Sequence, residues 1–123
     1  ENVRCLGAFY AAVAVDDYEA ALRQVDREVM LAIYAGGTVP YRMAAHGTVE
    51  VGDAIRRNFA VITFERIDVE SLVAQGDVVV LILRQRGHWR HNGDEYDERG
   101  VLEFHFRAGR VRHYRGFVLP FAA

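Results

Sequence analysis

The hydrophobic pattern of this chain changes its period once, near Phe64, and that change constrains the fold more than any other feature. Before it, apolar residues recur at spacings of three and four, which is typical of one helix face, as in Val3, Leu6, Tyr10 and Val13. After it, apolar and polar residues alternate, as in residues 66–73, which is typical of strands with one buried face. Helices followed by consecutive strands predict an α+β fold rather than a parallel α/β fold.

Two more helices and one early strand are expected before the change of period. Asp16 and Glu19 form a capping box, and a helical stripe follows it, made of Tyr18, Ala21, Leu22 and Val25. Residues 29–35 are β-like and end at Gly36-Gly37. A third helix fits residues 53 to about 61.

Three turn signals divide the second half into an antiparallel meander of four strands: Gly76-Asp77, Asn92-Gly93 and Ala108-Gly109. A two-residue turn at Asn92-Gly93 would pair Trp89 with Tyr96. At Ala108-Gly109, a turn with a one-residue bulge would pair Leu102 with Tyr114, whereas a tight turn would pair Glu103 with Tyr114. The expected interior face carries Val69, Val73, Val79, Leu81, Leu83, Gln85, Leu102, Phe104, Phe106, Arg112, Tyr114, Gly116 and Val118. Asp68 and Glu70 are expected in solvent.

Composition narrows the class of protein. The 123 residues, 51% hydrophobic and 26% charged, are expected to form a single domain over residues 1–123. The longest apolar stretch, Val78 to Leu83, is far shorter than the ~20 residues that span a bilayer. One cysteine excludes an internal disulfide, and the scattered histidines indicate no metal site. A net charge of −2 and the absence of phosphate or dinucleotide motifs argue against a nucleic-acid partner or a nucleotide cofactor. We expect a cytoplasmic location.

The order of elements resembles the nuclear transport factor 2-like superfamily, and within it the SnoaL-like and ketosteroid-isomerase-like proteins. Residues 46–59 carry part of the resemblance, because His46-Gly47 leads into Gly52-Asp53-Ala54-Ile55, one residue away from the family's spacing. Residues 104–118 resemble the family's closing hairpin, with a basic and an aliphatic residue after the turn glycine. The resemblance implies a cone-shaped roll, with N-terminal helices in the concave face of a curved, mostly antiparallel sheet. It also implies a deep apolar pocket and a homodimer through the outer sheet face, where Val101, Val111 and Phe117 are expected.

The catalytic groups that the resemblance implies are not matched. A ketosteroid-isomerase-like base would fall near Ile33, its helical tyrosine near Phe9, with Tyr10 adjacent, and its second acid near Leu102. For an epoxide-hydrolase-like relay, Arg84 could be the arginine, but the two acids would fall at Arg86 and Gly116. Whether the chain is an enzyme therefore stays open, with isomerase-, cyclase- or hydrolase-like acid–base chemistry as the expectation if it is.

His46 is the best candidate for proton transfer, because a neutral imidazole can accept or donate a proton near pH 7. The alternative is a loop histidine bonded to the backbone. Ligand-binding candidates are the tyrosines that could present hydroxyls inward and the residues of the expected interior face: Tyr10, Tyr34, Tyr41, Gln85, Trp89, Tyr96, Leu102, Phe104 and Tyr114.

These observations predict a pocket protein that binds a small, apolar, oxygenated ligand and that could isomerise, cyclise or hydrate it. No metal or other cofactor, no nucleic acid and no membrane partner are expected. The alternative is a non-catalytic, dimeric binding or interaction module.

Overall fold

A computed structural model describes residues 2–15, 17–35 and 43–120. Two helices come first, α1 (Asn2–Ala14) and α2 (Tyr18–Leu22), followed by strands β1 (Val25–Ala35) and β2 (Met43–His46). Helix α3 (Gly47–Val61) then leads into β3 (Ile62–Gln75), β4 (Val78–Trp89), β5 (Glu95–Arg107) and β6 (Arg110–Pro120). None of the helices that these residues form is long and apolar enough to cross a membrane.

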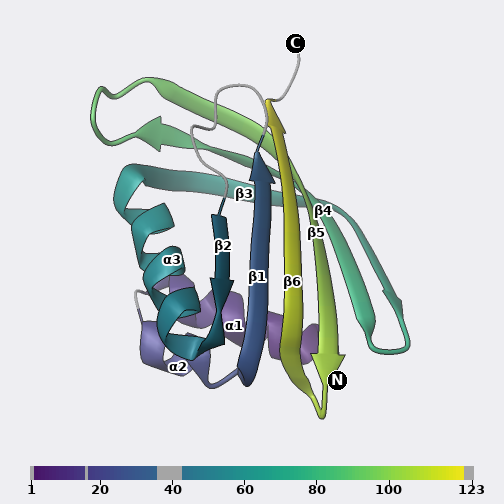
Figure 1. The fold of residues 1–123 in the computed structure, drawn as a ribbon. Coiled ribbons are helices and arrows are strands. Elements are labelled where there is room, and N and C mark those ends of the chain that lie inside the picture. The colour runs from purple at the N-terminus through teal and green to yellow at the C-terminus, as the bar shows by residue number, and fades with distance from the viewer. Residues whose placement is uncertain (1, 16, 36–42, 121–123) are drawn as a thin grey trace.

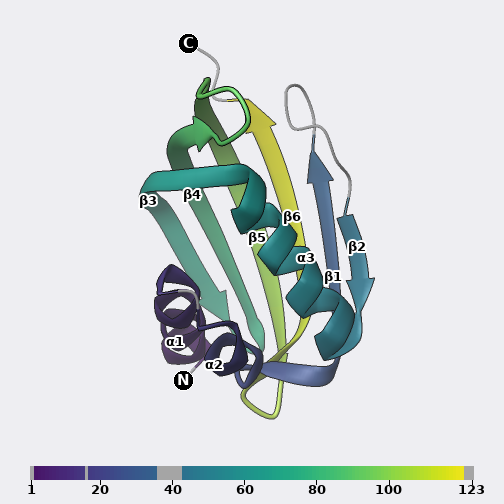
Figure 2. The ribbon, with the colours of Figure 1, turned by 90° about the vertical axis from the view of Figure 1, so that its left-hand side faces the viewer.

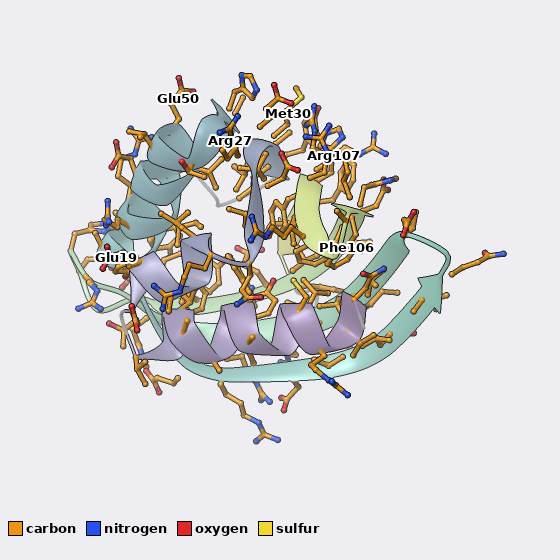
Figure 3. All side chains as sticks on the ribbon, turned by 90° about the horizontal axis from the view of Figure 1, so that it is seen from below. Glu19, Arg27, Met30, Glu50, Phe106 and Arg107 are labelled. Carbon is orange, nitrogen blue, oxygen red and sulfur yellow. The ribbon has the colours of Figure 1, made fainter. Side chains whose placement is uncertain are left out.

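The six strands form one curved sheet in the order β2-β1-β6-β5-β4-β3. All neighbouring strands are antiparallel except β1 and β6, which run parallel and join the first half of the chain to its end. All three helices lie on the concave side, with α1 and α2 at one end and α3 crossing the sheet (Figures 1 and 2). Viewed from below, β3 curls around α1 (Figure 3). The predicted α+β architecture is confirmed.

The helices differ from the prediction at their ends. The α2 N-cap is Asp17, whose carboxylate accepts a hydrogen bond from the Ala20 backbone N–H at 3.1 Å, whereas the predicted cap, Asp16, lies outside the described residues. Helix α2 ends at Leu22, and Val25 already belongs to β1. Helix α3 begins at Gly47 rather than at residue 53, because Gly47 adopts a φ of 83° that lets the chain turn directly from β2.

Both C-terminal hairpins differ in register from the prediction. Gly87 pairs with Tyr96, so the Trp89–Tyr96 pairing was wrong. The longer loop is held by Asn92, whose side-chain oxygen accepts from the Asp94 N–H at 2.8 Å. The turn at Ala108-Gly109 is tight, with both φ angles positive, but a bulge follows it. Tyr114 therefore faces Phe104, rather than Leu102 or Glu103.

The predicted face assignment survives most of these changes, because a shift by two residues returns each side chain to the same face. Two bulges in β3 are the exception. The second lies between Val69 and Ser71, and it turns Val73 to the outside, where 59% of its surface is exposed. Val69 faces the concave side opposite Leu83 but is 56% exposed. Asp68 and Glu70 bind arginines on the outer face, as expected for solvated residues.

The main core lies between the concave face and the helices. It contains side chains from α1, β1, α3 and the last three strands, among them Leu6, Val29, Ala54, Leu81 and Phe104. Val111 belongs to this core with 3% of its surface exposed, so its predicted place on the outer face was wrong. A smaller cluster of Ile62 and Tyr96, with Phe64, Trp89 and Val118 against it, closes the other end of the sheet.

Candidate functional site

A cavity lies between α1, α3 and the concave face of the sheet. Its walls come from α1, β1, α3 and the four C-terminal strands, and consist of Phe9, Tyr10, Val13, Val25, Val29, Leu31, Ile33, Val51, Ala54, Ile55, Phe64, Ile67, Gln85, Phe104, Val111 and Tyr114. About 80 Å³ of this space can be reached by the centre of a water molecule. No Asp, Glu, His, Lys or Arg is among the described residues that line it. The cavity therefore favours an uncharged ligand.

Two tyrosine hydroxyls meet in this wall. Tyr10, on α1, is hydrogen-bonded to the side chain of Tyr114, on β6. Burial, and then the neighbouring Tyr114, raise the pKa of Tyr10 well above its usual value. Phe104 packs edge-on against both rings, with centroids 6.4 Å from Tyr10 and 4.8 Å from Tyr114. The pair is thus a neutral hydrogen-bonding group held in an apolar wall.

Gln85 supplies the remaining polar group of the cavity wall. It lies on β4, opposite Ile67 of β3 and Glu98 of β5. A side-chain amide can both donate and accept hydrogen bonds without carrying charge.

Four predicted ligand-binding residues are brought together in the cavity wall, namely Tyr10, Gln85, Phe104 and Tyr114. Leu102 lies beneath them in the core, 3% exposed. Trp89 and Tyr96 form part of the smaller cluster at the end of the sheet, where their rings pack edge-on.

The other predicted site residues lie elsewhere. Tyr34 is on the outer face, stacked on Phe117 with ring centroids 5.2 Å apart. Tyr41 lies outside the described residues. His46 is exposed at the N-cap of α3, where its backbone N–H donates to the Glu50 carboxylate at 3.0 Å and its side chain makes no capping bond. It is not among the residues that line the cavity.

Most of the apolar wall was not singled out from the sequence. Val51, Ala54 and Ile55 have the i, i+3, i+4 spacing of one helix face, so this part could have been found by starting the third helix earlier. Phe64 and Ile67 could not have been predicted to line the cavity together, because they lie on the same face of β3 only as a result of the bulge between them.

Glu98 is the one buried charged side chain among the described residues, with 2% of its surface exposed. Its acidic neighbour Asp97 points to the outer face and binds Arg84 through two hydrogen bonds, at 2.9 and 2.7 Å. Alternation places Glu98 on the concave face beside Gln85. Asp97 and Glu98 therefore lie on opposite faces of the sheet.

The outer face combines an apolar row with ion pairs. The row crosses neighbouring strands in register and consists of Tyr34, Phe117, Val101 and Ile82. On one side of it Arg99 binds Glu70 at 2.9 Å, and on the other Arg115 binds Glu103. The guanidinium of Arg115, followed by His105, holds the pKa of Glu103 below its usual value.

This arrangement of helices, sheet and cavity agrees with what a comparison with protein families finds. The model of the SnoaL-like domain matches residues 6–114. The chain belongs to the SnoaL-like family. Its sequence matches none of the curated proteins with which it was compared.

Solved structures show the same fold at low sequence identity. A nuclear transport factor 2-like protein from Burkholderia xenovorans LB400 is 18% identical, with a TM-score of 0.80 over 95% of this chain and 88% of that one. A protein with a ketosteroid isomerase-like fold from Catenulispora acidiphila DSM 44928, in complex with trimethylamine, is 14% identical, with a TM-score of 0.75 over 91% and 82%. TerC, co-crystallised with polyporic acid, is 19% identical, with a TM-score of 0.79 over 94% and 88%.

As a SnoaL-like protein, this chain has apolar residues where acid–base groups were expected from the resemblance. Ile33, at the position expected for a base, lines the cavity, as does Phe9. Leu102 and Gly116 are buried on the sheet and carry no ionisable group. The SnoaL-like fold is thus present with a cavity wall that lacks a carboxylate or imidazole among its described residues.

Proposed function

We propose that this protein binds a small, mostly apolar, oxygenated molecule in the cavity, with the Tyr10–Tyr114 pair as its hydrogen-bonding partner. The observation that carries the proposal is the wall itself, in which two hydrogen-bonded hydroxyls interrupt an apolar surface that has no charged side chain among its described residues. An oxygen of the ligand would satisfy the hydroxyls, and its hydrocarbon part would replace water on the apolar wall. Two of the compared structures of this fold were crystallised with small molecules, which is consistent with such a role.

The function that we propose is ligand binding, and it does not include a catalysed reaction. Isomerisation, cyclisation or hydration would require a group that accepts a proton, and neither a carboxylate nor an imidazole is among the described wall residues. His46 stays the sequence-based candidate for that role. Replacing His46 by alanine should abolish any turnover while leaving binding intact. Equal turnover in the variant and the wild type would show that His46 is not the catalytic group.

A thermal-shift experiment with cyclic ketones and terpenoid epoxides, each compared with its parent hydrocarbon, tests the binding proposal. A ligand at one hundred times its Kd stabilises the folded state by about 2.7 kcal/mol and should raise Tm by several degrees. The shift should shrink in Tyr114→Phe and persist in Tyr34→Phe, which changes a tyrosine on the outer face. The proposal fails if hydrocarbons shift Tm as much as their oxygenated partners, or if no compound shifts it.

We also propose that two copies pair through the outer face. Tyr34 and Phe117 expose 41% and 40% of their surfaces within the apolar row. The ion pairs beside the row, Arg99–Glu70 and Arg115–Glu103, join opposite charges within one chain, which limits repulsion when the face meets its own copy. A non-catalytic, dimeric binding module would use this same surface.

Sedimentation equilibrium tests the pairing of copies. Phe117→Asp, which places a charge in the apolar row, should weaken the dimer. Val49→Asp is the matched control, since Val49 is an exposed valine on α3, outside the sheet. A monomeric wild-type protein at micromolar concentration, or equal dimerisation of the two variants, would contradict this proposal.

A further inference from the structure

Gln85 is a polar side chain in an apolar wall with no hydrogen bond to any residue that the structure describes. The side chain is half-buried and lines the cavity, and neither of its amide atoms is among the buried side-chain atoms that lack a hydrogen-bond partner. Such an amide can exchange its hydrogen bonds to water for hydrogen bonds to a ligand, whereas an apolar group placed against it would leave it unsatisfied. A bound molecule that offers a polar group at this point would satisfy the amide.

Gln85 and the tyrosine pair lie at a distance that one small molecule can bridge. The Tyr114 hydroxyl lies 3.4 Å from the place that a Cβ on Gly116 would take. Gly116 pairs with Leu102, which pairs with Leu81 on β4. Gln85 is four residues beyond Leu81 and lies two strands away from Gly116, so about 13 Å along the strand and about 10 Å across the strands place these two backbone positions roughly 16 Å apart. A six-membered ring with oxygens at opposite ends, roughly 6 Å apart, spans about 11–12 Å with a hydrogen bond of about 2.8 Å at each end, and the Gln85 side chain covers the remaining few ångströms.

The volume and charge of the cavity set further limits. The 80 Å³ open to water centres corresponds to roughly five to eight water-sized spheres, which suits a molecule on the order of ten non-hydrogen atoms. A single ring with its substituents has this size, and a fused tetracyclic skeleton does not. A carboxylate or ammonium group would lose its hydration without gaining an opposite charge from the described wall residues.

We propose, building on the function proposed above, that Gln85 is a second recognition point of the cavity. The cavity then takes an uncharged molecule of single-ring size with an oxygen function at each end, one meeting the tyrosine hydroxyls and the other the Gln85 amide. Gln85 thereby distinguishes such molecules from those with one oxygen.

Isothermal titration with three matched probes tests this inference: cyclohexanone, 4-hydroxycyclohexanone and 4-oxocyclohexanecarboxylate. Wild-type protein should bind 4-hydroxycyclohexanone roughly five- to tenfold more tightly than cyclohexanone, because one hydrogen bond makes a net contribution of about that factor. It should bind the carboxylate most weakly. Gln85→Leu and Gln85→Met should bind the two neutral probes with equal affinity and so lose the preference. Gln75→Leu, at the exposed end of β3, is the matched control and should keep it.

The possible failures can be told apart. If the preference for the hydroxyketone persists in both Gln85 variants, or is absent from the wild type, the role of Gln85 is refuted while binding at the tyrosine pair stands. If the carboxylate binds most tightly, the uncharged class is wrong. If neither neutral probe binds, and none of the compounds of the thermal-shift panel binds either, both the proposed function and this inference are refuted.

Discussion

Replacing Gly87 by alanine is expected to destabilise the protein strongly, because β3 passes too close to β4 for a side chain there. A Cβ on Gly87 would lie 2.9 Å from the carbonyl carbon of Thr63 and 3.1 Å from the Cα of Phe64, and closer still to the Thr63 carbonyl oxygen. These are backbone atoms, so no side-chain rotation can relieve the contact. Gly87 pairs with Phe64 directly beside the first bulge of β3.

The magnitude follows from the pairing that must be given up. Moving β3 away from β4 by about an ångström around Thr63 would break two or three backbone hydrogen bonds of the ladder, each with a net contribution of about 0.5–1.5 kcal/mol. We therefore expect the free energy of unfolding to fall by about 2–4 kcal/mol. Phe64 and Ile67, on either side of the bulge, line the cavity, so ligand binding should weaken too.

Urea denaturation followed by circular dichroism measures this change, and Gly7→Ala is the control. Gly7 lies within α1 and has no neighbouring atom within 4 Å of an added Cβ. Alanine there should raise the free energy of unfolding by about 0.5–1 kcal/mol, because it favours helix. The two substitutions should thus act in opposite directions. A Gly87→Ala protein as stable as the wild type would refute the reasoning about the close approach of β3.

Four further outcomes are expected. Phe104→Ala should lower the free energy of unfolding by about 3–5 kcal/mol in urea, because this 1% exposed ring is surrounded by core. Asp17→Ala should lower it by about 1 kcal/mol through loss of the α2 cap. Arg84 lowers the pKa of Asp97 through their hydrogen bonds. This pair therefore stabilises the fold above the unfolded pKa of Asp97, near 4, and the contribution disappears as pH falls through the folded pKa. The Arg84→Met protein should be less stable than the wild type at pH 7 and should lose less stability than the wild type between pH 4 and 2. Burial raises the pKa of Tyr10, so an ultraviolet titration should show a tyrosine that stays protonated well above pH 10 and is missing in Tyr10→Phe.

The order of elements and the buried face of each C-terminal strand could largely be predicted from the sequence. Periods of three to four and of two depend on neighbours along the chain, so they can be recognised locally. The face assignment of Gln85, Phe104 and Tyr114 also survived the wrong registers, because each hairpin shifted by two residues in register or kept its parity through a bulge.

Contacts between distant parts of the chain decided the rest. Gly87 in β4 permits the bulge that brings Phe64 and Ile67 onto one face of β3. The hydrophobic period within β3 does not predict this bulge. The parallel pairing of β1 with β6 places Tyr34 on the outer face beside Phe117. It also sets Leu31 next to Tyr114, and Tyr114 meets Tyr10 from the first helix. The sequence alone determined the type and order of most elements, because those preferences are local, but not β2 or the ends of the helices. Which tyrosines share a cavity depended on register, bulges and strand order, and these are fixed only when the whole sheet assembles.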